Sequence, residues 1–191
     1  MKMNSINILI VGVGGQGTLL TSRIIGKTAL AAGYDVKLSE VHGMAQRGGS
    51  VVTFVRFGEK VFEPVCEEGC VDVLISFERL EALRYAHFLK KDGVMIVNDT
   101  RIDPMTVVIG AKTYPEGILE GLEKKHKLYT IDGGKIANEL GNSKVLNSVV
   151  LGLAAKHIGF DEAAWLETLK NTVPPKTIEI NTQAFKAGYE K

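Results

Sequence analysis

Residues 6–17 read INILIVGVGGQG, and this stretch decides the fold class. Five of its first six residues are apolar, and such a run is typical of a strand buried on both faces of a parallel sheet. Gly12, Gly14 and Gly17 follow at once, and a helical pattern then extends over residues 18–32. A glycine-rich turn between a buried strand and a helix predicts the start of a Rossmann-like βαβ unit.

The glycine loop is also the first candidate for a binding site. The spacing GxGxxG permits a tight turn and a close approach of phosphate to the backbone, and it places free amides at a helix N-terminus, which favour an anion. Gly15 and Gln16 complete this loop. A dinucleotide site would need an acid near the end of the second strand, and Glu40 is the only residue well placed. The reading in which the glycines serve only turn geometry and packing stays equally open.

Further strands and helices alternate along the rest of the chain. The predicted strands are 34–39, 51–57, 72–77, 94–97, 106–109 and 128–131, and the predicted helices are 78–90, 115–125, 135–140, 143–157, 162–170 and 177–187. This alternation predicts an α/β fold with a mainly parallel sheet and helices on both faces. Strand 51–57 follows its predecessor without an intervening helix, so we expect it to be antiparallel to that neighbour or at an edge.

The segment 40–49, EVHGMAQRGG, has too few apolar residues for a core element. It leaves the carboxyl end of the second strand, where doubly wound sheets bind their ligands. Arg47 offers a fork of donors beside Gly48 and Gly49, which suits a phosphate, a carboxylate or a docked partner. His42 could titrate near neutrality and Gln46 could orient a ligand, although a solvated or capping role for His42 is also open.

Size and composition place the chain among ordinary globular domains. It has 191 residues, 45% of them hydrophobic, and a formal net charge of +1. This size fits one domain, residues 1–191, and the charge provides no field that would attract nucleic acid or an anionic membrane. No apolar stretch is long enough for a membrane helix, and the N-terminus lacks the layout of a signal peptide. We therefore expect a cytoplasmic protein.

The only two cysteines are Cys66 and Cys70, in CEEGC. Two thiolates cannot complete a zinc or iron–sulfur site that usually needs four protein ligands. We expect incidental reduced thiols here, with a redox pair as the alternative. The chain is therefore expected to bind no metal of its own.

Four segments together resemble one family, the gamma-type domain of 2-oxoacid:ferredoxin oxidoreductases. They are GVGGQGT at 12–18, SEVHGMAQRGGSV at 39–51, NSVVLG at 147–152 and NTQAFKAGYE at 181–190. The resemblance covers nearly the whole chain, and the long central segment is much more specific than GxGxxG. The form HGMAQRGG is most similar to the small (beta) subunits of the branch that acts on indolepyruvate.

The resemblance implies a reaction that the chain cannot perform alone. Members of this family oxidatively decarboxylate a 2-oxoacid with thiamine diphosphate, coenzyme A and ferredoxin, and yield an acyl-CoA, CO₂ and reduced ferredoxin. This chain has neither the GDG and asparagine pair of thiamine enzymes nor a CxxCxxC run. The resemblance therefore implies an accessory subunit without catalytic residues, beside a large partner that carries thiamine diphosphate and the iron–sulfur clusters and passes electrons to ferredoxin.

We expect the two glycine-rich loops, 12–17 and 47–49, to lie at one sheet edge and face the partner's active site. There they would help to close it and receive a coenzyme A phosphate or the oxoacid carboxylate. Asn147 matches the family pattern, but the sequence leaves open whether it binds a ligand or satisfies a buried backbone group. The alternatives are a free-standing NAD(P)-dependent oxidoreductase, which the glycine loop alone would suggest, and a pure interaction module.

Overall fold

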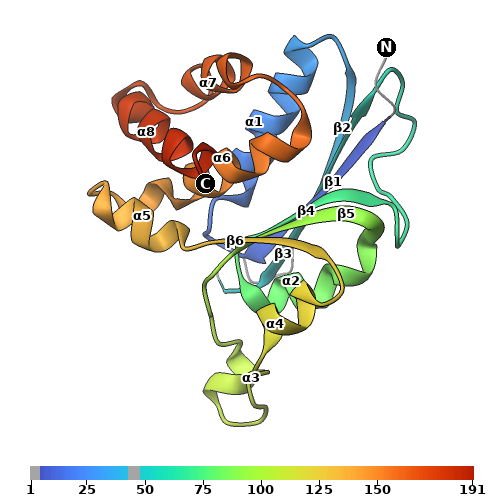
Figure 1. The fold of residues 1–191 in the computed structure, drawn as a ribbon, viewed down its shortest axis with the longest axis vertical. Coiled ribbons are helices and arrows are strands. Elements are labelled where there is room, and N and C mark those ends of the chain that lie inside the picture. The colour runs from blue at the N-terminus through green and yellow to red at the C-terminus, as the bar shows by residue number, and fades with distance from the viewer. Residues whose placement is uncertain (1–4, 43–47) are drawn as a thin grey trace.

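A six-stranded sheet forms the centre of the computed structural model, which describes residues 5–42 and 48–191, with His42 described by its backbone alone. The strands are β1 (Ile6–Val13), β2 (Asp35–His42), β3 (Ser50–Gly58), β4 (Val71–Ser76), β5 (Leu89–Asn98) and β6 (Lys127–Ile131). Their order in the sheet is β2-β3-β1-β4-β5-β6 (Figure 1). β1, β4, β5 and β6 pair in parallel, as the alternating pattern predicts.

Helices cover both faces of this sheet. They are α1 (Thr18–Ala31), α2 (Arg79–Tyr85), α3 (Met105–Val108), α4 (Ile118–Glu123), α5 (Gly133–Glu139), α6 (Leu146–Ile158), α7 (Glu162–Lys170) and α8 (Ile178–Tyr189), with 3₁₀ turns η1 (Ala86–Phe88), η2 (Ser143–Val145) and η3 (Pro175–Thr177). Figure 1 shows α1, α6, α7 and α8 on one side and α2 and α4 on the other. The predicted α/β class with two covered faces is confirmed.

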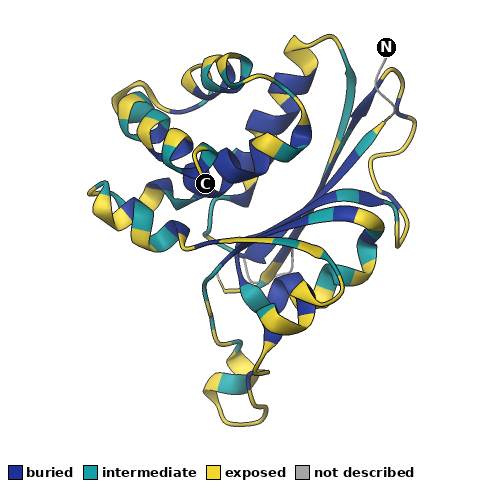
Figure 2. Cartoon of the chain, in the orientation of Figure 1, coloured by how far each residue is buried: buried dark blue, intermediate teal, exposed yellow. Residues whose placement is uncertain are grey.

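The apolar run of β1 supplies both cores. Ile8 and Ile10 belong to the cluster beneath α1, α6, α7 and α8, whereas Leu9 and Val11 belong to the cluster beneath α2 and α4. All four side chains are fully buried, and Figure 2 shows the central strands as buried throughout their middles. Because successive residues of a strand point to opposite faces, an unbroken apolar run is what a strand between two helical layers requires.

β3 is the one strand that runs against the rest. It pairs antiparallel with β2 on one side and with β1 on the other. The expectation of an antiparallel arrangement is therefore confirmed, and the edge placement is wrong, because β3 lies inside the sheet and β2 forms its edge. A direct connection from β2 to β3 permits this arrangement, since antiparallel neighbours need no crossover helix.

Two predicted elements are corrected by the structure. Residues 106–109 form no strand: most of them belong to α3, and Val108 and Ile109 are 67% and 68% exposed on a projecting segment (Figure 2). The helix predicted over 78–90 ends at Tyr85, because β5 begins at Leu89, which pairs with Val71 of β4. Short apolar runs do not distinguish strand from helix, and pairing partners decide between them.

Helices α6 and α8 approach each other unusually closely. A Cβ at Gly152 would lie 2.0 Å from the Phe185 carbonyl oxygen, and one at Gly188 would lie 1.9 Å from that of Val149. A buried hydrogen bond of 2.6 Å from the Ser148 hydroxyl to the Asn181 side chain joins the same helices. The segment NSVVLG at 147–152, which contributes to the family resemblance, therefore also packs α6 against α8.

Candidate functional site

The strands that run in the same direction all end at one edge of the sheet, and we call the part of this edge from β2 to β5 the carboxyl rim. It comprises the ends of β1, β2, β4 and β5, at Val13, His42, Ser76 and Asn98, together with the start of the antiparallel β3 at Ser50. The amides of the glycine loop and the residues just before β3 therefore meet at the same place. Ligands of open α/β sheets bind beyond this kind of edge.

The two glycine-rich loops are in direct contact on the carboxyl rim. The Gly14 amide donates to the Gly49 carbonyl at 2.9 Å, and the Gly48 amide donates to the Gly14 carbonyl at 3.5 Å. The expectation that the loops share one edge is confirmed for these glycines. Gln46 and Arg47 lie outside the described residues, and so does the His42 side chain.

Gln16 braces the glycine loop from within. Its side-chain oxygen accepts from the Val13 amide at 2.7 Å, and its side-chain nitrogen donates to the Phe77 carbonyl at 2.9 Å. The side chain thus joins the end of β1 to the residue that follows β4. Gln16 therefore holds the loop in place, which differs from a direct ligand role.

Replacement of Gln16 by alanine should loosen this loop. The Val13 amide would lose its acceptor, and we expect unfolding free energy to fall by about 1–2 kcal/mol. Urea denaturation measures this, with Gln183→Ala as the control because Gln183 is exposed on α8 and should change stability by less than about 0.5 kcal/mol. Equal losses for the two variants would contradict the bracing role.

Gly17 and Asn147 meet where α1 begins. Gly17 caps α1 with φ of 86°, a left-handed conformation that disfavours any side chain. A Cβ there would also lie 3.0 Å from the Cβ of Asn147 on α6. The third glycine of the motif thus permits close packing against a helix from the second half of the chain. The structure places Asn147, a predicted site residue, beside the glycine loop.

The start of α1 is electrostatically suited to an anion. Within the described part of the chain, no side chain caps this helix and its first turn holds no acidic residue. Asn147, which lies beside this helix start, is 5% exposed. Free amides and the positive end of a helix dipole attract negative groups. The arrangement can therefore accept an anion at Gly17.

The same rim holds a buried polar network that the sequence patterns did not predict. Glu78 and Glu81, one helical turn apart, are 1% and 5% exposed. Glu78 accepts from the hydroxyl of Tyr114 at 2.6 Å, and Glu81 accepts from that of Ser50 at 2.5 Å. Glutamates near a helix start are usually solvated, so the sequence alone carried no signal that these two are buried.

This network borders a cavity of about 170 Å³ that also touches the glycine-rich loops. Its lining comprises Val13, Gly48, Ser50, Glu78, Leu80, Glu81, Arg84, Ile102 and Pro104. Burial raises the pKa of Glu81 above its ordinary value, although the Ser50 hydroxyl and the Arg84 guanidinium oppose that rise. Burial and the hydrogen bond to Glu78 likewise raise the pKa of Tyr114.

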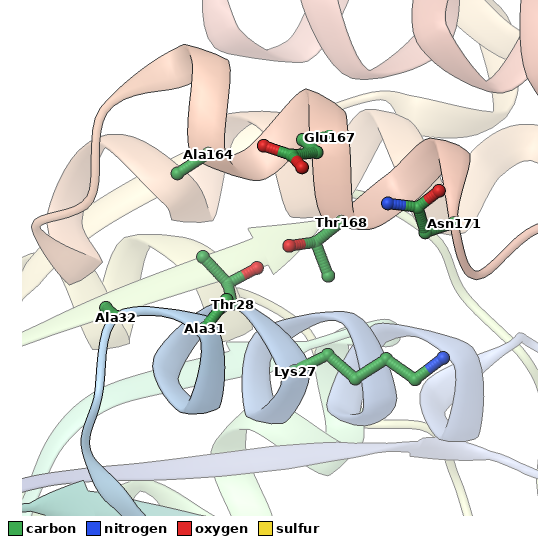
Figure 3. A pocket seen from close by; sticks show the side chains of 8 residues that line it. All are labelled: Lys27, Thr28, Ala31, Ala32, Ala164, Glu167, Thr168 and Asn171. Carbon is green, nitrogen blue, oxygen red and sulfur yellow. The ribbon is translucent and has the colours of Figure 1, made fainter.

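A larger hollow of about 450 Å³ lies elsewhere, between α1 and α7 (Figure 3). Its lining includes Lys27, Ala31 and Thr168, from the second half of α1 and from α7. Because α1 rises about 1.5 Å per residue, Ala31 lies roughly 20 Å from the helix start at Gly17. This hollow therefore does not belong to the carboxyl rim.

A family model described as pyruvate ferredoxin/flavodoxin oxidoreductase matches residues 7–191. The chain belongs to this family. It is also 43% identical, over 97% of its length and 95% of the relative's, to the indolepyruvate oxidoreductase subunit IorB of Thermococcus kodakarensis. The expected membership of a 2-oxoacid:ferredoxin oxidoreductase family, as one of its small subunits, is thus confirmed.

Solved structures of this family share the fold. The gamma subunit of a keto/oxoacid ferredoxin oxidoreductase from Geobacter sulfurreducens matches with a TM-score of 0.71 and 23% identity over 97% of this chain and 96% of that one. A chain of the 2-oxoglutarate:ferredoxin oxidoreductase from Magnetococcus marinus, solved with coenzyme A, matches with a TM-score of 0.77 and 20% identity, over 99% of this chain and 31% of that one.

Family membership and sheet order both disfavour the NAD(P) alternative. In a dinucleotide-binding unit, the second strand lies beside the first and its terminal acid reaches the ribose. Here β3 separates β2 from β1, which places them two strand spacings, about 10 Å, apart. Glu40 accepts instead from the Ser22 hydroxyl of α1 at 3.4 Å.

The described residues of this family member contain no group of three or more histidine, cysteine or acidic side chains that could hold a metal ion. Cys66 and Cys70 are both free, and burial raises the pKa of the Cys66 thiol. A search of the described helices finds none that is long and apolar enough to cross a membrane. A four-thiolate cluster does not fit this chain, which has two cysteines in total.

Proposed function

We propose that this chain is the small accessory subunit of an oxidoreductase that acts on aryl 2-oxoacids, with indolepyruvate as its substrate. In the reaction the oxoacid loses CO₂, coenzyme A receives the acyl group as a thioester, and ferredoxin accepts the released electron pair. The observation that carries this proposal is the 43% identity to an indolepyruvate oxidoreductase subunit over 97% of the chain. Residues 1–191 would act as one domain of the complex.

A division of labour between two subunits follows from this proposal. Thiamine diphosphate and the iron–sulfur clusters would reside in a large partner chain, which would also pass electrons to ferredoxin. The two cysteines here and the lack of a metal-ligand group among the described residues support that division. When bound in the partner, those groups supply the decarboxylation and electron-transfer chemistry, and this chain supplies orientation and electrostatics.

The carboxyl rim is the surface that this subunit would present to the partner's active site. Its predicted site residues are Gly12, Gly14, Gly15, Gln16, Gly17, His42, Gln46, Arg47, Gly48, Gly49 and Asn147. The contacts of Gly14 with Gly48 and Gly49 support a joint role for the two loops. The helix start at Gly17, which no side chain of the described residues caps, supports an anionic ligand, either a coenzyme A phosphate or the oxoacid carboxylate.

Co-purification tests the subunit assignment directly. A tagged full-length chain should retain a large partner whose absorbance shows iron–sulfur clusters and whose extract contains thiamine diphosphate. The isolated chain should show no fluorescence change with micromolar NADH. Micromolar NADH binding without a retained partner would instead favour the free-standing oxidoreductase.

The Arg47→Ala variant of the assembled complex tests the role of the loop. Loss of a charge-assisted hydrogen bond of about 1.5–3 kcal/mol should raise the Michaelis constant for coenzyme A or for the oxoacid by roughly 10- to 100-fold. Arg23→Ala is the control, because Arg23 is an exposed arginine on α1 that is not among the predicted site residues. Unchanged constants for both substrates would rule out the anion-binding role of Arg47.

A further inference from the structure

Glu81 lies at a buried position that is energetically unfavourable for a carboxylate. It is 5% exposed on the face of the sheet that α2 and α4 cover, and burial raises its pKa. Among the described residues it forms an ion pair with Arg84 at 3.2 Å, and the Arg84 side chain is itself half-exposed. Buried ion pairs contribute little net stability in general, and an apolar side chain of similar size often serves as well. The position therefore calls for an explanation other than stability.

The contact that distinguishes Glu81 is its hydrogen bond with Ser50. Ser50 is the first residue of β3 and immediately follows Gly48 and Gly49. Its hydroxyl donates to the Glu81 carboxylate at 2.5 Å. On the other side, Gly48 and Gly49 bond to the backbone of Gly14. The end of the 43–49 loop is therefore held from two directions, by the glycine loop and by α2.

The cavity of about 170 Å³ lies between these attachments, since Gly48, Ser50 and Glu81 all line it. The Glu81 carboxylate lies beside this cavity, at the end of a glycine-rich loop. It can fix the direction of that loop only while its hydrogen bond with Ser50 persists. Glycine lacks a side chain that would restrict the backbone, so an external attachment is needed for a single loop geometry.

We propose that Glu81 is a positioning residue: through Ser50 it fixes the exit of the 43–49 loop at Gly48 and Gly49, for substrate binding by the assembled enzyme. The inference rests on the proposed function for its kinetic consequence, but its structural part concerns this chain alone. Glu78, which lines the same cavity and caps α2, accepts a hydrogen bond from the Glu81 backbone amide at 2.9 Å. Glu78 therefore holds the backbone of Glu81 in place.

Two pairs of substitutions separate the hydrogen bond from general packing. Glu81→Met and Ser50→Ala remove the bond, whereas Glu81→Gln and Ser50→Thr keep an acceptor and a donor in place. In the assembled complex, the first pair should raise the Michaelis constant of coenzyme A or the oxoacid by about 10-fold, with kcat changed less than about 2-fold. The second pair should stay within about 3-fold of wild type, and Glu139→Met, on the exposed end of α5, serves as the control.

Hydrogen exchange on the isolated full-length chain tests the structural part without any partner. Glu81→Met and Ser50→Ala should speed amide exchange at residues 48–52 by about 10-fold while the melting temperature of Glu81→Met stays equal or rises. The double variant should be no worse than either single one, because both remove one interaction. This readout distinguishes failure of the positioning role from failure of the subunit assignment.

Opposite outcomes would overturn the inference. If exchange increases only within α2, or if the two single effects add in the double variant, Glu81 merely stabilises its own helix. If exchange at 48–52 rises but both Michaelis constants stay unchanged in an assembled, active complex, the loop exit does not govern substrate binding. If no active complex forms with the wild-type chain, the subunit proposal fails, and the exchange result still decides the role of Glu81.

Discussion

Gly152→Ala should reduce the unfolding free energy by about 3 kcal/mol or more, the largest effect that we expect from one methyl group. The added Cβ would lie 2.0 Å from the Phe185 carbonyl oxygen and 2.8 Å from the Tyr189 amide nitrogen, both in the backbone of α8. Backbone atoms of a helix cannot move aside singly, so α6 and α8 would have to separate. Separation would also strain the buried bond between Ser148 and Asn181.

Urea denaturation monitored by circular dichroism measures this loss. Gly121→Ala is a matched control, because Gly121 is exposed in α4 and a Cβ there meets nothing within 4 Å. Since alanine favours helix over glycine by about 1 kcal/mol, this control should be neutral or slightly stabilising. A loss below about 1 kcal/mol for Gly152→Ala would show that the two helices tolerate separation.

Glu78→Ala should cost about 3–5 kcal/mol, because one deletion leaves several buried donors without an acceptor. The carboxylate accepts from the Glu81 amide at 2.9 Å, the Tyr114 hydroxyl at 2.6 Å and the Ile102 amide at 3.2 Å. These donors come from α2 and from both ends of the projecting segment that contains α3. Their loss would release that segment from the sheet.

The same denaturation assay tests Glu78, with Glu123→Ala as an exposed control on α4 that should change stability by less than about 0.5 kcal/mol. Tyr114→Phe removes one of the three donors and should cost about 1–2 kcal/mol. Hydrogen exchange over residues 99–114 should rise in Glu78→Ala. Similar midpoints for Glu78→Ala and Glu123→Ala would mean that solvent replaces the lost acceptor.

Sequence patterns predicted the centre of the fold well. The apolar run at 6–11, the glycine turn and the following helix correspond to β1, the rim loop and α1. These elements depend on neighbouring residues, so local periodicity is enough to find them. The strand predicted at 106–109 failed because a short apolar run has the same local pattern whether it is buried in a sheet or exposed on a projecting helix.

The candidate site was predicted only in its loops. Gly14 and Gly49 could be proposed as neighbours because both follow strands that end at the same edge. Three other features could not be predicted from the sequence, because each depends on an element distant in the chain. They are the bracing role of Gln16, the packing of Asn147 on Gly17 and the burial of Glu78 and Glu81.

By itself, then, the sequence determined the alternation of strands and helices, the turn that begins the first helix and the family to which the chain belongs, since each is written in short, contiguous patterns. Only the tertiary structure decided that β3 enters between β2 and β1, and that the buried Glu81 of α2 accepts a hydrogen bond from Ser50. The physical reason is that burial and hydrogen-bond partners are properties of packed surfaces, and packing brings together residues that no local pattern connects.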